Sequence, residues 1–323
     1  MGLGTNQLTT SIAGTSNGFI PEMWSDEVSI RYKANLVLGN VVETMSMDGK
    51  YGDIIHIPTI TRGTTAQQFS AQGAEVSFSA PTINETQIAL NQWWVHGKQI
   101  PDIVEKQALP SMRRIIVDDM SYSLALAVDD YLHDTVAQLL RGATALAGTV
   151  IGSDGSTVWS GSANTNTGNG ASLTDEGIRR IVQQLDDIDA PGTGRVWVVP
   201  PIEKRKLLGI SRYTEQAFTG EGGSGSSIRN GRVGDLYGSE VYVTSNCSSF
   251  TADDTTTTYR QALYLHKSAI MLVTQIKPRV QSQYKVEFLS DAIVADVAFG
   301  AKVLRTENSA SLDRGISIAI PNS

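Results

Sequence analysis

The sequence predicts an α+β protein, and three patterns along the 323-residue chain support that fold class. Residues 110–141 carry apolar side chains at helical spacing throughout, which predicts one long helix. Residues 58–92 predict two long antiparallel strands with a polar tip between them. After residue 195, alternating and continuous apolar runs predict a series of further strands. Long strands and a long helix in separate parts of the chain are typical of α+β folds.

The N-terminal part of the chain predicts little regular structure. Residues 1–19 are small and polar without any period, which predicts an extended arm. Residues 20–48 hold scattered apolar positions and are consistent with one short helix. The run GDIIHIPTI at 52–60 is typical of a short strand.

The hairpin that continues through residues 61–97 has a tip without a hydrophobic core of its own. Its middle is polar and contains Gly63, Gly73 and Pro81. Burying one large apolar side chain is worth roughly 1.5–3 kcal/mol, whereas ordering each backbone residue costs about 1–2 kcal/mol. We therefore expect residues 63–82 to become ordered only against a neighbouring molecule. The large apolar residues in that stretch are Phe69, Val76 and Phe78.

The helix predicted over 110–141 has clear ends and a broad apolar face. Pro110 suits a first helical turn, and Gly142 follows the last one. At 1.5 Å per residue the helix would be roughly 45–50 Å long, which indicates a spine for a flat structure. We expect Asp118, Asp129 and His133 on the opposite, solvated face. The apolar face comprises Ile116, Met120, Leu124, Ala127, Val128, Tyr131, Leu132 and Leu139.

A second unit is expected after the loop at 143–171, which is rich in Gly, Ser, Thr and Asn. It begins with a helix in 172–192 that Ser172 or Thr174 can cap. The segment RVWVVPPIEKRKLLG (195–209) then predicts a buried strand followed by a short helix with proline at its start. Further strands are expected at 240–246, 261–273, 276–306 and 315–321.

Composition and charge exclude several classes of protein. Charged residues make up 18% of the chain, below the roughly 25% usual in soluble proteins, so much of the surface can be buried against neighbours. The net charge of −7 and the absence of any long Lys or Arg run argue against a nucleic-acid-binding face. Cys247 is the only cysteine, which excludes a disulfide within the chain. No apolar run is long enough to span a membrane, and no signal peptide is evident, so we expect folding in a reducing cytoplasm.

The segment GEGGSG at 220–225 matches the glycine fingerprint of a dinucleotide-binding turn. Such a turn needs a buried strand before it and a helix after it, so that backbone N–H groups meet the pyrophosphate. The preceding SRYTEQAF is polar, and the following SSIRNGRVGDLYG is rich in turn residues. We therefore expect a flexible loop here and no nucleotide site.

Two aspartate pairs, Asp118–Asp119 and Asp129–Asp130, stack along the predicted helix. The string DDYLHD resembles the magnesium-binding motif of isoprenoid synthases, but His133 stands where that motif needs its third acid. The histidines are scattered, and the HExxH motif does not occur. The sequence therefore predicts a solvated acidic face, with no catalytic, metal-binding or cofactor-binding residue.

Three phrases and the order of the predicted parts carry a resemblance to a known family. The phrases are RVWVVPPIEKRKLLG (195–209), the glycine-spaced IRNGRVGDLYGSEVYVTSN (228–246) and FIPEMWSDEVSIRYKANLVLGNVV (19–42). Together with the arm, hairpin, long helix and α/β unit, they resemble the major capsid protein of tailed bacteriophages, of podovirus type. The resemblance implies the Hong Kong 97-type fold over nearly the whole chain.

This resemblance implies a division of the chain into domains. The peripheral domain would contain residues 35–57, 93–172 with the spine helix at 110–141, and the strands of 267–310. The axial domain would comprise 173–266, with its glycine loop at 220–234 near a five- or six-fold axis. The remaining parts would be an N-terminal arm at 1–34, an extended loop at 58–92 that lies over a neighbour, and a C-terminal strand at 311–323 in either domain.

The resemblance also implies a non-catalytic shell subunit found in the virion and assembled in the host cytoplasm. Its partners would be copies of itself in pentamers and hexamers, a separate scaffolding protein, a portal protein and optionally a decoration protein. The shell would enclose double-stranded DNA without sequence-specific binding. Residues 61–97 contain no lysine, so we expect no covalent cross-link from the loop. The expected subunit-interface residues are Arg62, Phe69, Glu75, Phe78, Glu85, Gly222, Gly225, Arg229 and Arg232.

Three alternatives remain open at this point. An encapsulin, a nanocompartment shell that stores cargo enzymes, would share the fold. An α/β enzyme would use the glycine loop as a nucleotide site. A monomeric binding module is disfavoured by a hairpin tip that has no core of its own.

Overall fold

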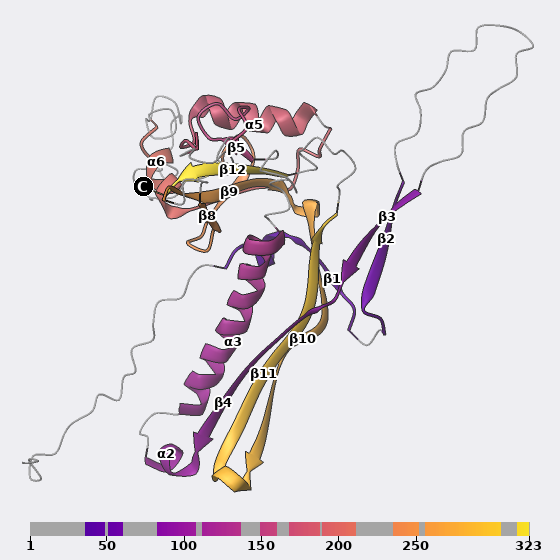
Figure 1. Ribbon diagram of the computed structural model, residues 1–323, viewed down its shortest axis with the longest axis vertical. Helices are drawn as coiled ribbons and strands as arrows, with labels where there is room; N and C mark the ends of the chain where they lie inside the picture. The colour runs from indigo at the N-terminus through magenta and orange to yellow at the C-terminus, as the bar shows by residue number, and fades with distance from the viewer. Residues whose placement is uncertain are drawn as a thin grey trace, which may run out of the picture.

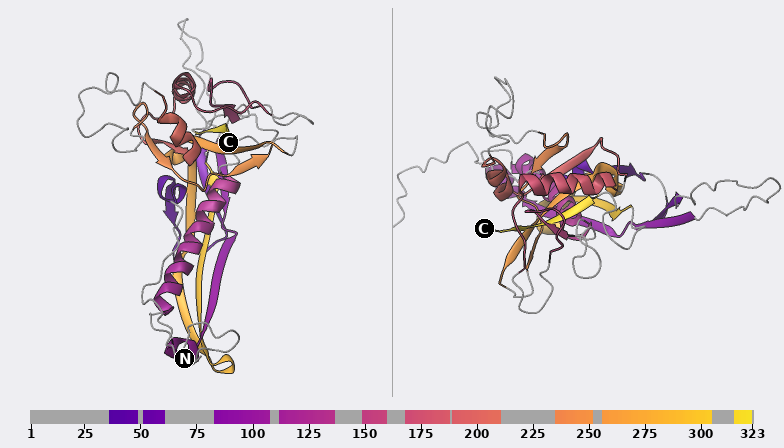
Figure 2. Two further views of the ribbon diagram at one scale, coloured as in Figure 1. Left: turned by 90° about the vertical axis from the view of Figure 1, so that its left-hand side faces the viewer. Right: turned by 90° about the horizontal axis from the view of Figure 1, so that it is seen from above.

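The computed structural model describes residues 36–48, 51–60, 83–107, 112–136, 149–159, 168–187, 189–210, 235–251, 256–304 and 315–322. Two sheets organise these residues (Figure 1). A long, narrow sheet with one long helix forms a spine, and a six-stranded sheet with shorter helices forms an upper unit at one end of it (Figure 2). A separate two-stranded hairpin stands beside the spine.

The spine sheet is built on two long antiparallel strands, β10 (Ile270–Lys285) and β11 (Ser290–Val303). The 3-10 turn η3 (Val286–Phe288) joins them at the far end of the spine. Strand β4 (Gln92–Pro101) pairs antiparallel with β11, and β1 (Glu43–Ser46) pairs parallel with β10. The strand order is therefore β1-β10-β11-β4. The spine sheet therefore combines β1 and β4 from the first part of the chain with β10 and β11 from its last part.

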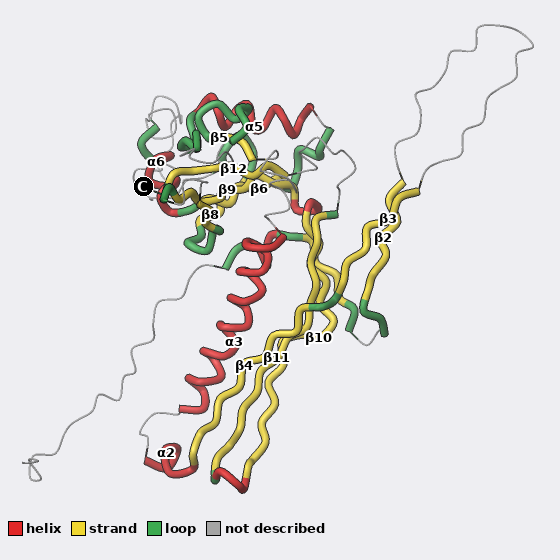
Figure 3. Tube along the Cα trace, in the orientation of Figure 1, coloured by secondary structure: helices red, strands yellow, loops and turns green. Residues whose placement is uncertain are grey.

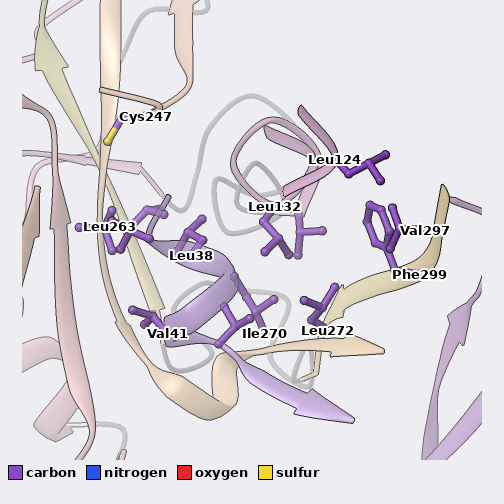
Figure 4. Close-up of a cluster of buried hydrophobic side chains, with 14 of the residues drawn as sticks. Leu38, Val41, Leu124, Leu132, Cys247, Leu263, Ile270, Leu272, Val297 and Phe299 are labelled. Carbon is purple, nitrogen blue, oxygen red and sulfur yellow. The ribbon is translucent and has the colours of Figure 1, made fainter. Parts of the chain in front are cut away.

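The predicted spine helix is observed as α3 (Met112–Tyr131), which continues as the π-helical turn η1 (Leu132–Val136). It covers one face of the spine sheet (Figure 2). Residues 110, 111 and 137–141 of the prediction lie outside the described residues. Leu124 and Leu132 are buried in a core with Phe299, and the short helix α1 (Leu38–Val41) closes the upper end of that core (Figure 4).

The expectation that Asp129 and His133 lie on a solvated face was wrong. Their exposed fractions are only 1% and 2%, whereas Asp118 and Asp119 are exposed as expected. The lower part of the helix is open on its far side. At its upper end, α1 and the turn around Asn246 approach Asp129 and cover this side as well. Helical spacing alone could not reveal this second contact.

The upper unit contains a six-stranded sheet with the order β5-β12-β9-β6-β7 and with β8 paired to β9. Two of its helices are α5 (Asp175–Asp187) and α6 (Pro201–Leu207). Its core includes Trp197 and Tyr264, whose rings stack with centroids 4.2 Å apart. The predicted strand and helix at 195–209 are confirmed as β6 and α6. The strands are β5 (Thr149–Ile151), β6 (Arg195–Val199), β7 (Glu240–Val243), β8 (Ser249–Thr251), β9 (Thr258–His266) and β12 (Gly315–Pro321).

Two strands extend the upper unit beyond the expected range 173–266. Strand β12 pairs antiparallel with β9, which assigns the C-terminal strand to this sheet. Strand β5 falls within 93–172, a range expected for the peripheral domain, yet it pairs parallel with β12. Pairing between strands distant in sequence joins both segments to this sheet, and the local pattern of the chain does not encode such pairing.

The separate hairpin consists of β2 (Ile54–Ile60) and β3 (Ile83–Ala89), in register from Ile54–Ala89 to Ile60–Ile83. Figure 3 shows these strands diverging from the long strands of the spine. The hairpin is anchored at its base, where Ile88 is fully buried against Met271 and Val273. Gly300 permits this approach, because a Cβ atom there would lie 2.2 Å from the Ala89 carbonyl oxygen. Helix α2 (Asp102–Gln107) follows β4 at the other end of the spine.

Candidate interaction surfaces

Glu85 is the one predicted interface residue that the structure describes. It is exposed on β3, where its Oε2 lies 3.2 Å from His56 Nδ1 on β2 and its Oε1 accepts a 2.8 Å hydrogen bond from Gln87. The contacts with Gln87 and His56 hold the pKa of Glu85 below its usual value. Both partners belong to the same hairpin, so Glu85 stabilises the pairing of β2 with β3 from the surface. The other eight predicted residues, Arg62, Phe69, Glu75, Phe78, Gly222, Gly225, Arg229 and Arg232, lie outside the described residues.

A cluster of exposed apolar side chains lies at the far end of the spine, and we call it the spine tip. The exposed fractions of its side chains run from 43% to 72%. Surfaces of this kind usually mark a contact with another molecule, because leaving large apolar groups in water is unfavourable. The spine tip consists of Ile103 and Val104 on α2 together with Val286, Phe288 and Leu289 around η3.

Hydrogen bonds hold the two halves of the spine tip together. The Asp102 N–H donates to the Leu289 carbonyl at 3.1 Å, and the Tyr284 hydroxyl donates to Asp102 Oδ2 at 2.8 Å. This second bond raises the pKa of Tyr284. Leu289 itself adopts a left-handed conformation with φ of 44°, which is uncommon for a leucine and tightens the turn after η3. The apolar residues of α2 and η3 therefore form one fixed surface.

A second apolar surface covers the face of the spine sheet that points away from α3, and we call it the open face. On β4, His96 contacts Ser123 of α3, so alternation directs Trp93 and Val95 to the opposite face. Trp93 is 68% exposed and Val95 is 53% exposed. Val294 of β11 lies beside them, cross-strand from Gly97. This face combines a large aromatic group with aliphatic neighbours, as interfaces commonly do.

An ion pair with a buried carboxylate supports the open face. Asp296 is 5% exposed and receives two hydrogen bonds from Arg279, at 2.9 Å and 3.0 Å. The Trp93 indole N–H also lies 3.4 Å from Asp296 Oδ2. The Arg279 hydrogen bonds are the main reason that the pKa of Asp296 is below its ordinary value. Because Arg279 and Trp93 both contact the Asp296 carboxylate, the tryptophan has a defined position on this surface.

The described residues offer little for chemistry. Cys247 is buried, and this burial raises the pKa of its thiol to about 12, so it is a poor nucleophile. Within the described ranges, no group of three or more His, Cys, Asp or Glu side chains is arranged to hold a metal ion. Over the same ranges, no helix has the length and apolar character needed to cross a membrane.

Sequence reasoning missed both the spine tip and the open face. The residues of the open face and those around η3 lie in segments that the sequence predicted simply as strands, and no element was predicted over α2. One local signal could have revealed the tip, since Val286, Phe288 and Leu289 place three large apolar groups at a strand-to-strand connection, where polar residues are usual. No comparable signal exists for the open face, because alternation on β4 does not show which face α3 covers.

Comparisons with known proteins agree with this architecture. The sequence matches the phage capsid protein family over residues 111–308, more than half of the chain. No curated protein matches it. A structure of Mycobacterium phage Che8 is similar with a TM-score of 0.68 and 22% identity, covering 94% of this chain and 98% of that one.

Two further solved structures extend the comparison. The capsid structure of the cyanophage P-SCSP1u has a TM-score of 0.70 and 16% identity, covering 94% of both chains. The capsid of Ralstonia phage GP4 has a TM-score of 0.66 and 14% identity, covering 98% of this chain and 99% of that one. These likenesses show the fold, which is the Hong Kong 97-type fold implied by the sequence resemblance.

Proposed function

The chain belongs to the phage capsid protein family, and from that premise we propose how its surfaces build the shell of a tailed phage. It is a major capsid protein, a structural subunit whose copies form the icosahedral container for the double-stranded DNA genome. The match favours this function over the encapsulin alternative. We propose that the subunit is not an enzyme and that it holds no cofactor.

The observation that carries this proposal is the exposed apolar surface at the spine tip. A solitary soluble protein gains nothing from holding Phe288 and Leu289 in water at the end of a rigid spine. Burying one such side chain fully is worth roughly 1.5–3 kcal/mol, and the surface is already ordered by hydrogen bonds, so little entropy is lost on contact. We propose that the tips of neighbouring subunits cover one another in the shell.

The open face and the hairpin would supply further contacts. We propose that the hairpin, with the loop of residues 61–82 beyond it, lies over a neighbouring subunit as the extended loop. The open face around Trp93 would receive such a neighbour. The upper unit would be the axial domain near five- and six-fold axes, with the glycine loop at 220–234 closest to the axis, and the spine unit would be the peripheral domain.

We further propose partners besides copies of the chain itself. They are a separate scaffolding protein during assembly, a portal protein and optionally a decoration protein. The net charge of −7 suits a container whose wall does not bind the packaged DNA. We propose that assembly takes place in the host cytoplasm and that the finished subunit resides in the virion.

Sedimentation and electron microscopy of the purified chain test the proposal. The chain alone, or together with its scaffolding protein, should form capsomers or closed shells. A stable monomer under both conditions would contradict self-assembly. Shells isolated from infected cells should contain double-stranded DNA, whereas shells filled with cargo enzyme would support the encapsulin alternative.

A further inference from the structure

A buried polar cluster, which we call the Asp129 junction, joins the spine helix to the upper unit. The Asp129 carboxylate is 1% exposed. Its Oδ2 accepts a hydrogen bond from Asn246 Nδ2 at 2.9 Å, and its Oδ1 accepts one from the Gly39 N–H at 3.3 Å. Asn246 lies in the upper unit, in the turn that follows β7. Gly39 lies in α1. A single carboxylate therefore connects three segments that are far apart in the sequence.

His133 completes the junction without forming a hydrogen bond through its Nε2. This nitrogen lies 3.7 Å from Asp129 Oδ2, the same oxygen that accepts from Asn246, and it has no hydrogen-bond partner among the described residues. The imidazole is 2% exposed and belongs to the π-helical turn η1. Buried polar atoms are rarely left unpaired, and π-helical turns often occur where a helix has a functional role.

Burial keeps the imidazole of His133 neutral near neutral pH. Burial lowers the pKa of His133, and the carboxylates of Asp129 and Asp130 offset only part of that effect. From the upper unit, the Cys247 thiol lies near Asp129 and Arg260 lies near Cys247. Helix α1, with the sequence LGNV, brings no ionisable side chain. Protonation of His133 therefore places a positive charge in a site that is packed around the neutral ring.

We propose that Asp129, His133 and Asn246 form a proton-dependent connection that sets the angle between the spine helix and the upper unit. When the ring is neutral, Asn246 and Gly39 hold the carboxylate. A protonated ring would form a charge-assisted hydrogen bond to Oδ2 at about 2.7–2.9 Å. Closing the gap from 3.7 Å would shift the π-helical turn or the carboxylate and would draw Oδ2 away from Asn246.

The direction of the response follows from the chemistry of the site. A histidine whose pKa is lowered in the folded arrangement favours that arrangement above the ordinary value of about 6.5. This contribution is lost as the pH falls from that ordinary value toward the lowered pKa. Acid should therefore loosen the contact of the spine helix with α1 and with Asn246. This inference goes beyond shell formation and concerns the internal geometry of the subunit.

Hydrogen–deuterium exchange of the full chain tests the proposal. Exchange is measured at about pH 7.5 and at about pH 5.5, on either side of the ordinary histidine pKa, and is corrected for the intrinsic rate with unfolded protein. In the wild type, protection of peptides that cover residues 36–42 and 244–248 should fall on acidification, because protonation of His133 weakens the hold of Asn246 and Gly39 on Asp129. In His133→Gln the same peptides should respond to pH far less.

Two further variants make the test specific. His56→Gln changes an exposed histidine of the hairpin and should keep the wild-type response. Asn246→Ala removes the bond to Asp129 and should reduce protection of residues 36–42 at both pH values. Circular dichroism verifies folding, and His133→Asn replaces His133→Gln if the latter does not fold. An equal pH response in the wild type and in either His133 variant would overturn the proposal.

Discussion

Arg279 and Asp296 form a two-point hydrogen-bonded pair across β10 and β11, with Nε 2.9 Å from Oδ1 and Nη2 3.0 Å from Oδ2. The carboxylate is buried, whereas half of the arginine side chain is exposed. The pair stands where the register of β10 and β11 shifts between Ile276 and Arg279. It therefore fastens the two long strands at a point where their regular pairing is interrupted.

We expect Asp296→Asn to destabilise the subunit near neutral pH. The pKa of Asp296 is lowered in the folded state, chiefly by Arg279. Its contribution to stability is therefore present above the ordinary aspartate pKa of about 3.9 and is lost as the pH falls below it. Urea unfolding should show a lower midpoint for the variant at pH 7, and the difference from the wild type should shrink toward pH 3.

Asp119→Asn is the matched control for this prediction. Asp119 also pairs with a cation, Lys98 at 2.9 Å, but both side chains are well exposed. Exposed pairs contribute about 0–1 kcal/mol, so this variant should unfold close to the wild-type midpoint. If the two substitutions lower the urea midpoint equally, burial of Asp296 does not make its ion pair more stabilising than an exposed pair.

The Cys247 thiol should react only when the protein unfolds. It is buried, and its pKa is raised to about 12, so almost no thiolate is present at pH 8. The Ellman reagent should label native subunits slowly, at the rate of unfolding, and should label them at once in strong denaturant. Because the raised pKa favours the protonated thiol in the fold, its contribution to stability should be lost above the ordinary thiol pKa of about 8.5.

A second cysteine provides the control for that measurement. Val158 is 47% exposed in the upper unit, so Val158→Cys should add one thiol that reacts within the mixing time. Rapid labelling of Cys247 in the native wild type would mean that the turn around Asn246 opens far more readily than its burial indicates.

Sequence reasoning succeeded where local signals were sufficient. The strand β6 has five buried residues, and proline at the start of α6 marks the change from strand to helix. Both features are visible in RVWVVPP without knowledge of the rest of the fold. The middle of α3 could be predicted for the same reason, because its apolar face repeats with helical spacing.

The remaining features depend on contacts between distant segments. Asp129 is buried because Gly39 and Asn246 approach it from segments 90 and 117 residues away. Phe288 is 60% exposed at the turn between β10 and β11, and strand periodicity contains no information about which turn residues another subunit would cover. The interface residues predicted in the glycine loop and at the hairpin tip stay a prediction.

Polar substitutions at the spine tip should weaken assembly without unfolding the subunit. Phe288→Ser and Leu289→Ser change side chains that are 60% and 64% exposed, so little is lost within the monomer. If a neighbour buries them, each substitution should cost about 1–2 kcal/mol per contact. The concentration needed for assembly should rise about tenfold or more, as measured by sedimentation. Val158→Ser, an exposed apolar residue away from the tip, should assemble normally, and unchanged assembly of both tip variants would remove the spine tip from the interface.

We expect the segment between β2 and β3 to act between subunits and not within one. The hairpin is anchored by Ile88, which lies near the C-terminal end of β3 and is fully buried against the spine sheet. Replacing residues 66–79 with a short Gly-Ser turn should therefore leave the circular dichroism and melting of the isolated subunit near wild type. The same change should abolish or weaken shells, because the extended loop would no longer reach a neighbour.

The anchor itself serves as the control for this replacement. Ile88→Ala should destabilise the isolated subunit by about 2–5 kcal/mol, since it leaves a cavity between the hairpin and the spine sheet. The two variants therefore separate the part of the hairpin that stabilises the subunit from the part that acts between subunits. If the loop replacement unfolds the isolated subunit, or if its shells form with unchanged stability, the segment does not act as an extended loop between neighbours.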